Sequence, residues 1–146
     1  MILELANQND LENLEHCGKK CLPIYYKKKD LENLHLDELF YIFKIHDNKH
    51  IIGFIILKKE KNENNIHINS IGILPEYRSL NIGSHAIQKI KELFPFHLIT
   101  LYVQTSNNKA IRFYKKNGFI ILTKKDDYYK NLKNNSAYKM IFYSNH

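Results

Sequence analysis

The sequence lacks a long apolar run, holds only two cysteines and contains almost no arginine. No stretch of about 18 apolar residues occurs, and the opening residues lack the charged-then-apolar order of a signal peptide. We therefore expect a soluble, cytoplasmic protein with no membrane partner. Cys17 and Cys21 have no second Cys/His pair at zinc-ligand spacing, which predicts packed thiols and neither a disulfide framework nor a metal site.

The charge is strongly basic, but its composition argues against specific nucleic-acid recognition. The 22 Lys and Arg residues outweigh 15 Asp and Glu residues, giving a net charge of +7. Only Arg78 and Arg112 are arginines, the residue type that reads guanine edges with two parallel hydrogen bonds. No specific nucleic acid is expected as a partner, while a weak attraction to an RNA-rich assembly such as the ribosome stays open.

The length and the hydrophobic pattern predict one α/β domain over residues 1–146. At 146 residues and 44% hydrophobic content, the chain can build one substantial core. The pattern predicts strands at 2–5, 39–44, 51–58, 66–73, 98–104, 119–124 and 137–143, and helices at 10–21, 28–34, 82–93 and from 107. This order predicts a mixed sheet with helices on both faces and a ligand at the carboxyl ends of its central strands.

A strand that runs directly into a helix start forms the first motif. The strand Ile66 to Ile73 leads through a turn into Arg78-Ser79-Leu80-Asn81-Ile82-Gly83 and a helix. Unpaired amides of the first helical turn and the positive end of the helix dipole make such a junction suitable for a diphosphate.

A second strand and helix follow in the same order. After the strand that ends at Gln104, Asn107 caps a helix that Gly118 closes. The two motifs together resemble the GCN5-related N-acetyltransferase (GNAT) superfamily. The strings 101–107, 124–130 and 22–26 make the chain similar to the NatE-type N-alpha-acetyltransferase catalytic subunit, over nearly its whole length.

The resemblance implies a GNAT fold and acetyl-CoA as the cofactor. Asn81 stands where the family usually has a glycine, and because Asn tolerates left-handed backbone angles we expect weakened but not lost binding. Capping and cofactor contact can share the Asn107 side chain. The implied cofactor contacts are Ile71, Gly72, Ile73, Arg78, Ser79, Leu80, Asn81, Ile82, Gly83, Ser84, Asn107 and Tyr114.

Alternating polar residues on the two central strands indicate where the catalytic groups lie. His67 and Asn69 alternate with isoleucines, and Tyr102 and Gln104 alternate with Leu101 and Val103. The NatE-type pattern has a tyrosine on the first strand and a histidine on the second, so this chain exchanges the two. We expect His67 to act as the base through a water and Tyr102 to orient it; the alternative is a histidine that is merely hydrogen bonded.

The choice of acceptor follows from the pKa of its amine. Deprotonating an α-amino group at neutral pH costs about 1 kcal/mol or less, against about 4 kcal/mol for a lysine. A histidine base therefore suits protein or peptide N-termini, and the resemblance implies a Met first residue and an apolar second one, with lysine side chains open as a further acceptor. The implied peptide contacts are Leu22, Pro23, Ile24, Tyr26, Asn69, Tyr128 and Tyr129.

Two alternatives share the cofactor but differ in role. One is a GNAT enzyme that acetylates a small-molecule amine. The other is a weakly catalytic acyl-CoA-binding subunit of an N-terminal acetyltransferase complex, favoured by Asn81 and by the His67/Tyr102 exchange. The NatE resemblance also implies auxiliary subunits and association with the ribosome as open expectations.

Overall fold

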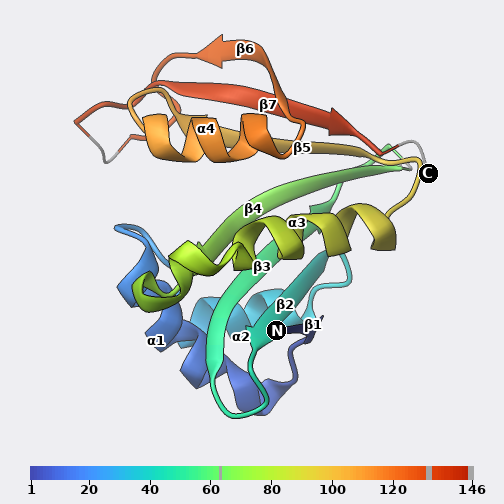
Figure 1. Cartoon of the computed structure of the whole chain (residues 1–146), viewed down its shortest axis with the longest axis vertical. Coiled ribbons are helices and arrows are strands. Elements are labelled where there is room, and N and C mark those ends of the chain that lie inside the picture. The colour runs from blue at the N-terminus through green and yellow to red at the C-terminus, as the bar shows by residue number, and fades with distance from the viewer. Residues whose placement is uncertain (63, 131–132, 145–146) are drawn as a thin grey trace.

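The computed structural model describes residues 1–62, 64–130 and 133–144, and it places a seven-stranded sheet at the centre of the molecule (Figure 1). The strands lie in the order β1-β2-β3-β4-β5-β7-β6, with β4 and β5 parallel and the other neighbours antiparallel. The strands are β1 Ile2–Leu5, β2 Phe40–His46, β3 Ile51–Lys59, β4 Asn65–Ile73, β5 Leu98–Gln104, β6 Ile120–Lys125 and β7 Ala137–Tyr143. The helices are α1 Leu11–Cys21, α2 Lys28–Leu36, α3 Ile82–Leu93 and α4 Asn108–Lys116, with 3₁₀ helices at Gln8–Asp10 and Pro75–Leu80.

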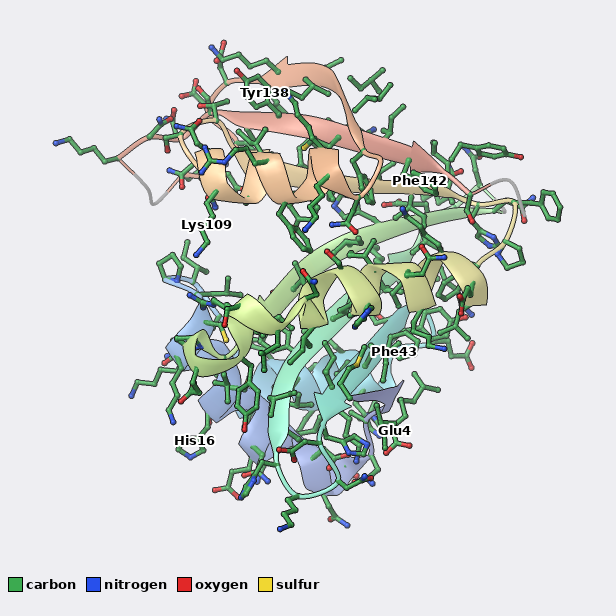
Figure 2. All side chains as sticks on the ribbon, viewed as in Figure 1. Glu4, His16, Phe43, Lys109, Tyr138 and Phe142 are labelled. Atoms are coloured by element: carbon green, nitrogen blue, oxygen red, sulfur yellow. The ribbon has the colours of Figure 1, made fainter. Side chains whose placement is uncertain are left out.

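Helices cover both faces of the sheet, as the sequence pattern predicts. On β3, Ile55 and Leu57 join the core under α3 and α4, whereas Phe54 and Ile56 join the core under α1 and α2. Side chains alternate between the faces of a strand, so a central strand covered on both sides is apolar throughout. Phe43, labelled in Figure 2, belongs to the α3 side of this core.

A β-bulge on β4 ends the contact between the two central strands. Ser70 pairs with Ile56 and Ile68 pairs with Leu57, so Asn69 has no opposite residue on β3. The parallel pairing with β5 runs only from Asn65 and Leu98 to Ile68 and Leu101. Because a bulge bends its strand and increases its twist, β4 turns away from β5 beyond this point, and the two strands separate in Figure 1.

Side chains between α3 and α4 connect the two halves of the sheet on one face. The Asn117 amide donates to the Ser84 hydroxyl over 3.2 Å, and the Lys91 ammonium donates to the Asn117 carbonyl. The same ammonium lies 3.9 Å from the centre of the Phe142 ring. These contacts bridge the strands at the helix layer, although the strands themselves diverge.

The observed elements agree with the sequence prediction except at the end of β4. There the expected open turn is a 3₁₀ helix, Pro75–Leu80, in which the Tyr77 N–H donates to the Leu74 carbonyl over 2.9 Å. Proline at its start favours this turn because its φ is already helical. None of the helices in the described ranges has both the length and the apolar content to span a membrane.

Candidate active site

Three polar side chains gather where β4 and β5 are paired. His67 and Thr100 are opposite residues of the parallel ladder, and His67 Nδ1 lies 2.7 Å from Thr100 Oγ1. The ring of Tyr102, two residues further along β5, lies 5.5 Å from the His67 ring, centre to centre. Leu101 and Val103 turn to the α3 side, so these polar residues share the opposite face of the sheet.

Burial and nearby lysines keep His67 neutral. Burial lowers the pKa of His67 below its ordinary 6.5, and Lys139 and Lys58 lower it further, while Glu60 opposes them. Lys58 is the β3 residue opposite His67, and Lys139 is the β7 residue opposite Tyr102. A Thr hydroxyl can accept from Nδ1–H, which leaves a free lone pair on Nε2. The ring is therefore unprotonated at neutral pH and presents Nε2 as a base.

An aromatic stack extends the site toward the β6–β7 connection. The Tyr128 ring stacks on Tyr102 at 4.3 Å, and Tyr129 packs edge-on against Tyr128 at 4.9 Å. Burial, with smaller contributions from Tyr102 and Tyr26, raises the pKa of Tyr128. Burial, with a contribution from Tyr128, raises the pKa of Tyr129 to about 12. These phenols stay protonated at neutral pH and can donate hydrogen bonds.

The start of α3 presents unpaired backbone donors. The first helical bond runs from the His85 N–H to the Asn81 carbonyl over 3.1 Å, so the amides of Ile82, Gly83 and Ser84 precede the helical ladder. Asn81 adopts the left-handed conformation, with φ 59°, and its side chain does not cap the helix. Asn81 thus adopts the left-handed backbone that asparagine tolerates, and the expected weakening of cofactor binding stays a prediction.

The Arg78 side chain faces the end of β4. Its Nε donates to the Ile73 carbonyl over 2.8 Å, so the guanidinium ties the 3₁₀ helix to that strand. Ser79 and Leu80 lie exposed in the same 3₁₀ helix. Only the amides that follow Asn81 therefore belong to the free first turn of α3.

The remaining cofactor candidates lie on either side of the diverging strands. Ile71, Gly72 and Ile73 pair with β3 on one edge and have no ladder to β5 within residues 64–130. Asn107 caps α4 through its Oδ1, which accepts from the Ala110 N–H over 3.1 Å. Tyr114 is buried in the core, and this burial, with a contribution from Tyr129, raises its pKa.

The expected apolar peptide pocket is only partly assembled. Leu22 and Tyr26 line a small hollow of about 10 Å³ together with Ser70 of β4, but a space of that size holds no more than about one water. Pro23 and Ile24 lie outside it, and Ile24 is 57% exposed. Asn69 is exposed on the bulge, beside this region of the sheet.

The sequence interpretation missed two contributors to the site. Thr100 is buried and holds the His67 ring, and the alternation Thr100-x-Tyr102-x-Gln104 already places it on the polar face. The bulge at Asn69 had no local signal, because it is defined by the pairing of β4 with β3.

We expect the His67 ring to titrate below 6.5, because burial and two cations disfavour its charged form. Replacing Lys139 with Met removes one cation, so the pKa of His67 rises but stays below 6.5, since burial remains. The NMR chemical shift of the His67 ring protons against pH measures both values. Lys124→Met, on the exposed strand β6, is the control and leaves the titration unchanged. A His67 pKa at or above 6.5 in the unmodified protein contradicts this account.

Comparisons with known proteins point to one family. The model of the acetyltransferase (GNAT) family matches residues 5–119. A probable N-acetyltransferase, san, of Drosophila melanogaster is 31% identical over 135 residues, which cover 86% of this chain and 71% of that protein. N-alpha-acetyltransferase 50 of Danio rerio is 29% identical over 132 residues, which cover 86% of this chain and 77% of that protein.

A solved structure extends the match to the fold. Arabidopsis thaliana Naa50, in complex with the bisubstrate analogue CoA-Ac-MVNAL, is 27% identical, covers 97% of both chains and superposes with a TM-score of 0.79. The family model alone covers well over half of the sequence. The chain therefore belongs to the acetyltransferase (GNAT) family and is an acetyl-CoA-dependent N-acetyltransferase.

Proposed function

We propose that this enzyme acetylates the α-amino group of protein N-termini, with Met first and an apolar residue second. The observation that carries the proposal is the neutral His67, held by Thr100 beside the stacked Tyr102 and Tyr128. Two relatives support it: one is named an N-alpha-acetyltransferase, and the other carries an analogue whose peptide begins Met-Val.

The residues present fit a coenzyme A diphosphate and arm. We assign the diphosphate to the amides of Ile82, Gly83 and Ser84, where the left-handed Asn81 leaves the helix end uncapped. The free edge of Ile71 to Ile73 suits the amides of the pantetheine arm, because strand edges bind extended chains through backbone hydrogen bonds. Asn107 uses only Oδ1 for its cap, so its amide NH₂ stays available. When bound, acetyl-CoA supplies the activated acetyl group.

The chain's own residues then handle the proton of the acceptor. His67 Nε2 receives the proton of the incoming ammonium through a water, while Thr100 fixes the ring through Nδ1. Lys58 and Lys139 disfavour the charged imidazolium, which limits how strongly the ring retains that proton. Tyr102, held against both His67 and Tyr128, orients the water or the acceptor.

The tyrosines suit a peptide backbone. Tyr128 and Tyr129 have raised pKa values and donate their phenol protons to carbonyl groups at neutral pH. Tyr26 makes a small contribution to the raised pKa of Tyr128, so the loop after α1 lies within electrostatic range of the β6–β7 connection, and we expect the two to border the acceptor. Asn69, exposed on the bulge, offers a side-chain amide to the same backbone.

Charge around the site disfavours the small-amine alternative when that amine is a polyamine. Lys125 lies 5.8 Å from the Tyr102 ring centre and 5.6 Å from the Tyr128 ring centre. Lys58 and Lys139 flank His67. Polycationic acceptors meet like charge here, whereas a peptide N-terminus brings a single ammonium.

His67→Ala tests the base. We expect kcat on a peptide beginning Met-Leu to fall about 10²–10⁴-fold, the usual contribution of a positioned acid or base. Calorimetry should give an unchanged Kd for acetyl-CoA, because His67 lies away from the start of α3. His35→Ala, on the exposed side of α2, is the control. An unchanged rate in His67→Ala supports the weakly catalytic subunit instead.

Asn81→Ala tests the diphosphate site. Alanine tolerates the left-handed conformation less well than asparagine, whose short polar side chain can hydrogen-bond locally, so we expect a loss of about 1 kcal/mol of unfolding free energy and a several-fold weaker Kd for acetyl-CoA. Asn81→Gly should bind at least as well as the unmodified enzyme. Asn48→Ala, also at positive φ but in the β2–β3 hairpin, controls for strain: it should lose stability and keep the Kd. Equal Kd values for Asn81→Ala and the unmodified enzyme contradict the assignment.

Peptide charge tests the lysine-lined acceptor site. Peptides with Asp at positions three and four should show a higher kcat/KM than otherwise identical peptides with Lys there, and added salt should reduce the difference. Lys125→Met should reduce the difference in kcat/KM between the Asp and Lys peptides, while Lys89→Met, on the exposed side of α3, should leave it unchanged. Preference for the Lys peptide, or for spermidine over both, contradicts this part of the proposal.

A further inference from the structure

Two thiols that the proposed reaction does not use lie in contact at the end of α1. Cys17 and Cys21 are four residues apart on the helix, and their Sγ atoms are 4.0 Å apart. Cys17 is buried, and Cys21, the last residue of α1, is half-buried. Only the second thiol is therefore open to a solvent-borne reagent.

Cys21 also contacts the segment that leads to the cofactor helix. The Arg78 guanidinium lies close enough to Cys21 to lower the pKa of its thiol, and the same side chain donates through Nε to the Ile73 carbonyl over 2.8 Å. On the other side, Cys21 packs against Gly72 so closely that a Cβ there would lie 2.9 Å from Cys21 Cβ. Any movement of Cys21 is thus transmitted to the end of β4 and to Arg78.

The surroundings of Cys21 favour its thiolate. The hydrogen bond from Cys17 and the contact with Arg78 lower the pKa of Cys21 to about 7, against the opposing effects of burial and Glu76. The same pairing raises the pKa of Cys17, which keeps its proton. One sulfur is a nucleophile at neutral pH, and its neighbour carries the proton that a later step needs.

We propose that Cys21 is a peroxide-reactive thiol whose oxidation forms a disulfide with Cys17 and loosens the cofactor-binding segment through Arg78. The Cys21 thiolate attacks hydrogen peroxide: an S–O bond forms, the O–O bond breaks, and the departing hydroxide takes a proton to become water. The Cys17 sulfur then attacks the sulfenic acid. An S–S bond forms, the S–O bond breaks, and the oxygen leaves as water with the Cys17 proton.

The disulfide requires a change in the last turn of α1. Residues four apart on a helix have Cβ atoms about 5–6 Å apart, whereas a disulfide needs about 3.5–4.5 Å. Cys21 ends the helix and Leu22 is already extended, so this turn can deform without breaking the rest of α1. The deformation moves Cys21 relative to Gly72 and Arg78, and so disturbs the segment that Arg78 ties to the end of β4.

The test compares the full-length enzyme with Cys17→Ser and Cys21→Ser before and after hydrogen peroxide. In the unmodified enzyme, mass spectrometry should show the loss of two hydrogen atoms in the peptide that holds both cysteines. The Kd for acetyl-CoA should weaken about fivefold or more, a typical coupling between sites, and dithiothreitol should restore it. Cys17→Ser should instead accumulate a sulfenic acid at Cys21 that dimedone traps. Cys21→Ser should keep its mass and its Kd.

Two results overturn the inference: no internal disulfide in the oxidised enzyme, or a disulfide that leaves the Kd for acetyl-CoA unchanged. The effect on affinity rests on the proposed placement of acetyl-CoA at α3, while the mass measurement does not. Both readouts are made without an acceptor peptide. Failure to acetylate N-termini would therefore contradict the proposed function and leave the thiol chemistry to be judged separately.

Discussion

The active-site arrangement depends on the point at which β4 and β5 stop pairing. Up to Ile68 and Leu101 the ladder fixes His67 opposite Thr100, which gives the imidazole a defined position. One residue later the bulge at Asn69 turns β4 away, and within the described ranges the edge of Ile71 to Ile73 has no strand partner on that side. One irregularity therefore separates a rigid region, which suits proton transfer, from a free strand edge, which suits an extended ligand.

Charge and burial act together on the side of the sheet that carries His67. Burial alone would lower the pKa of a histidine, and Lys58 and Lys139 add to this effect from the neighbouring strands. Burial raises the pKa values of Tyr128 and Tyr129, whereas it lowers that of His67. As a result, the unprotonated His67 lies near two protonated phenols, those of Tyr128 and Tyr129. Relative to the NatE-type pattern, His67 and Tyr102 stand on exchanged strands. Both still face the same side of the sheet, so the pairing of an imidazole with a phenol is kept.

Local signals predicted most of the fold and part of the site. The cap at Asn107, the closing Gly118 at positive φ and the alternation on β4 and β5 each depend on a few neighbouring residues, and the structure agrees with all three. The left-handed conformation of Asn81 is compatible with the tolerance of asparagine that the sequence interpretation used, although the conformation itself was not predicted. The bulge, the length of the parallel ladder and the lysines around His67 depend on pairing between distant segments, which no single stretch of sequence encodes. The first-residue pocket was expected by resemblance, and Pro23 and Ile24 stand outside the hollow that Leu22 lines.

The links between α3 and α4 determine how the molecule can flex. The Asn117 amide donates to Ser84, and the Asn117 carbonyl accepts from Lys91, whose ammonium also lies over the Phe142 ring. These contacts tie the two halves of the sheet together on a single face. Among the residues that the structure describes, the opposite face, where Tyr102 and Tyr128 stack, shows no comparable hydrogen bond between β4 and β5 beyond their four paired positions. Bending about the helix layer would therefore change the width of the molecule chiefly on the side from which an acceptor would enter.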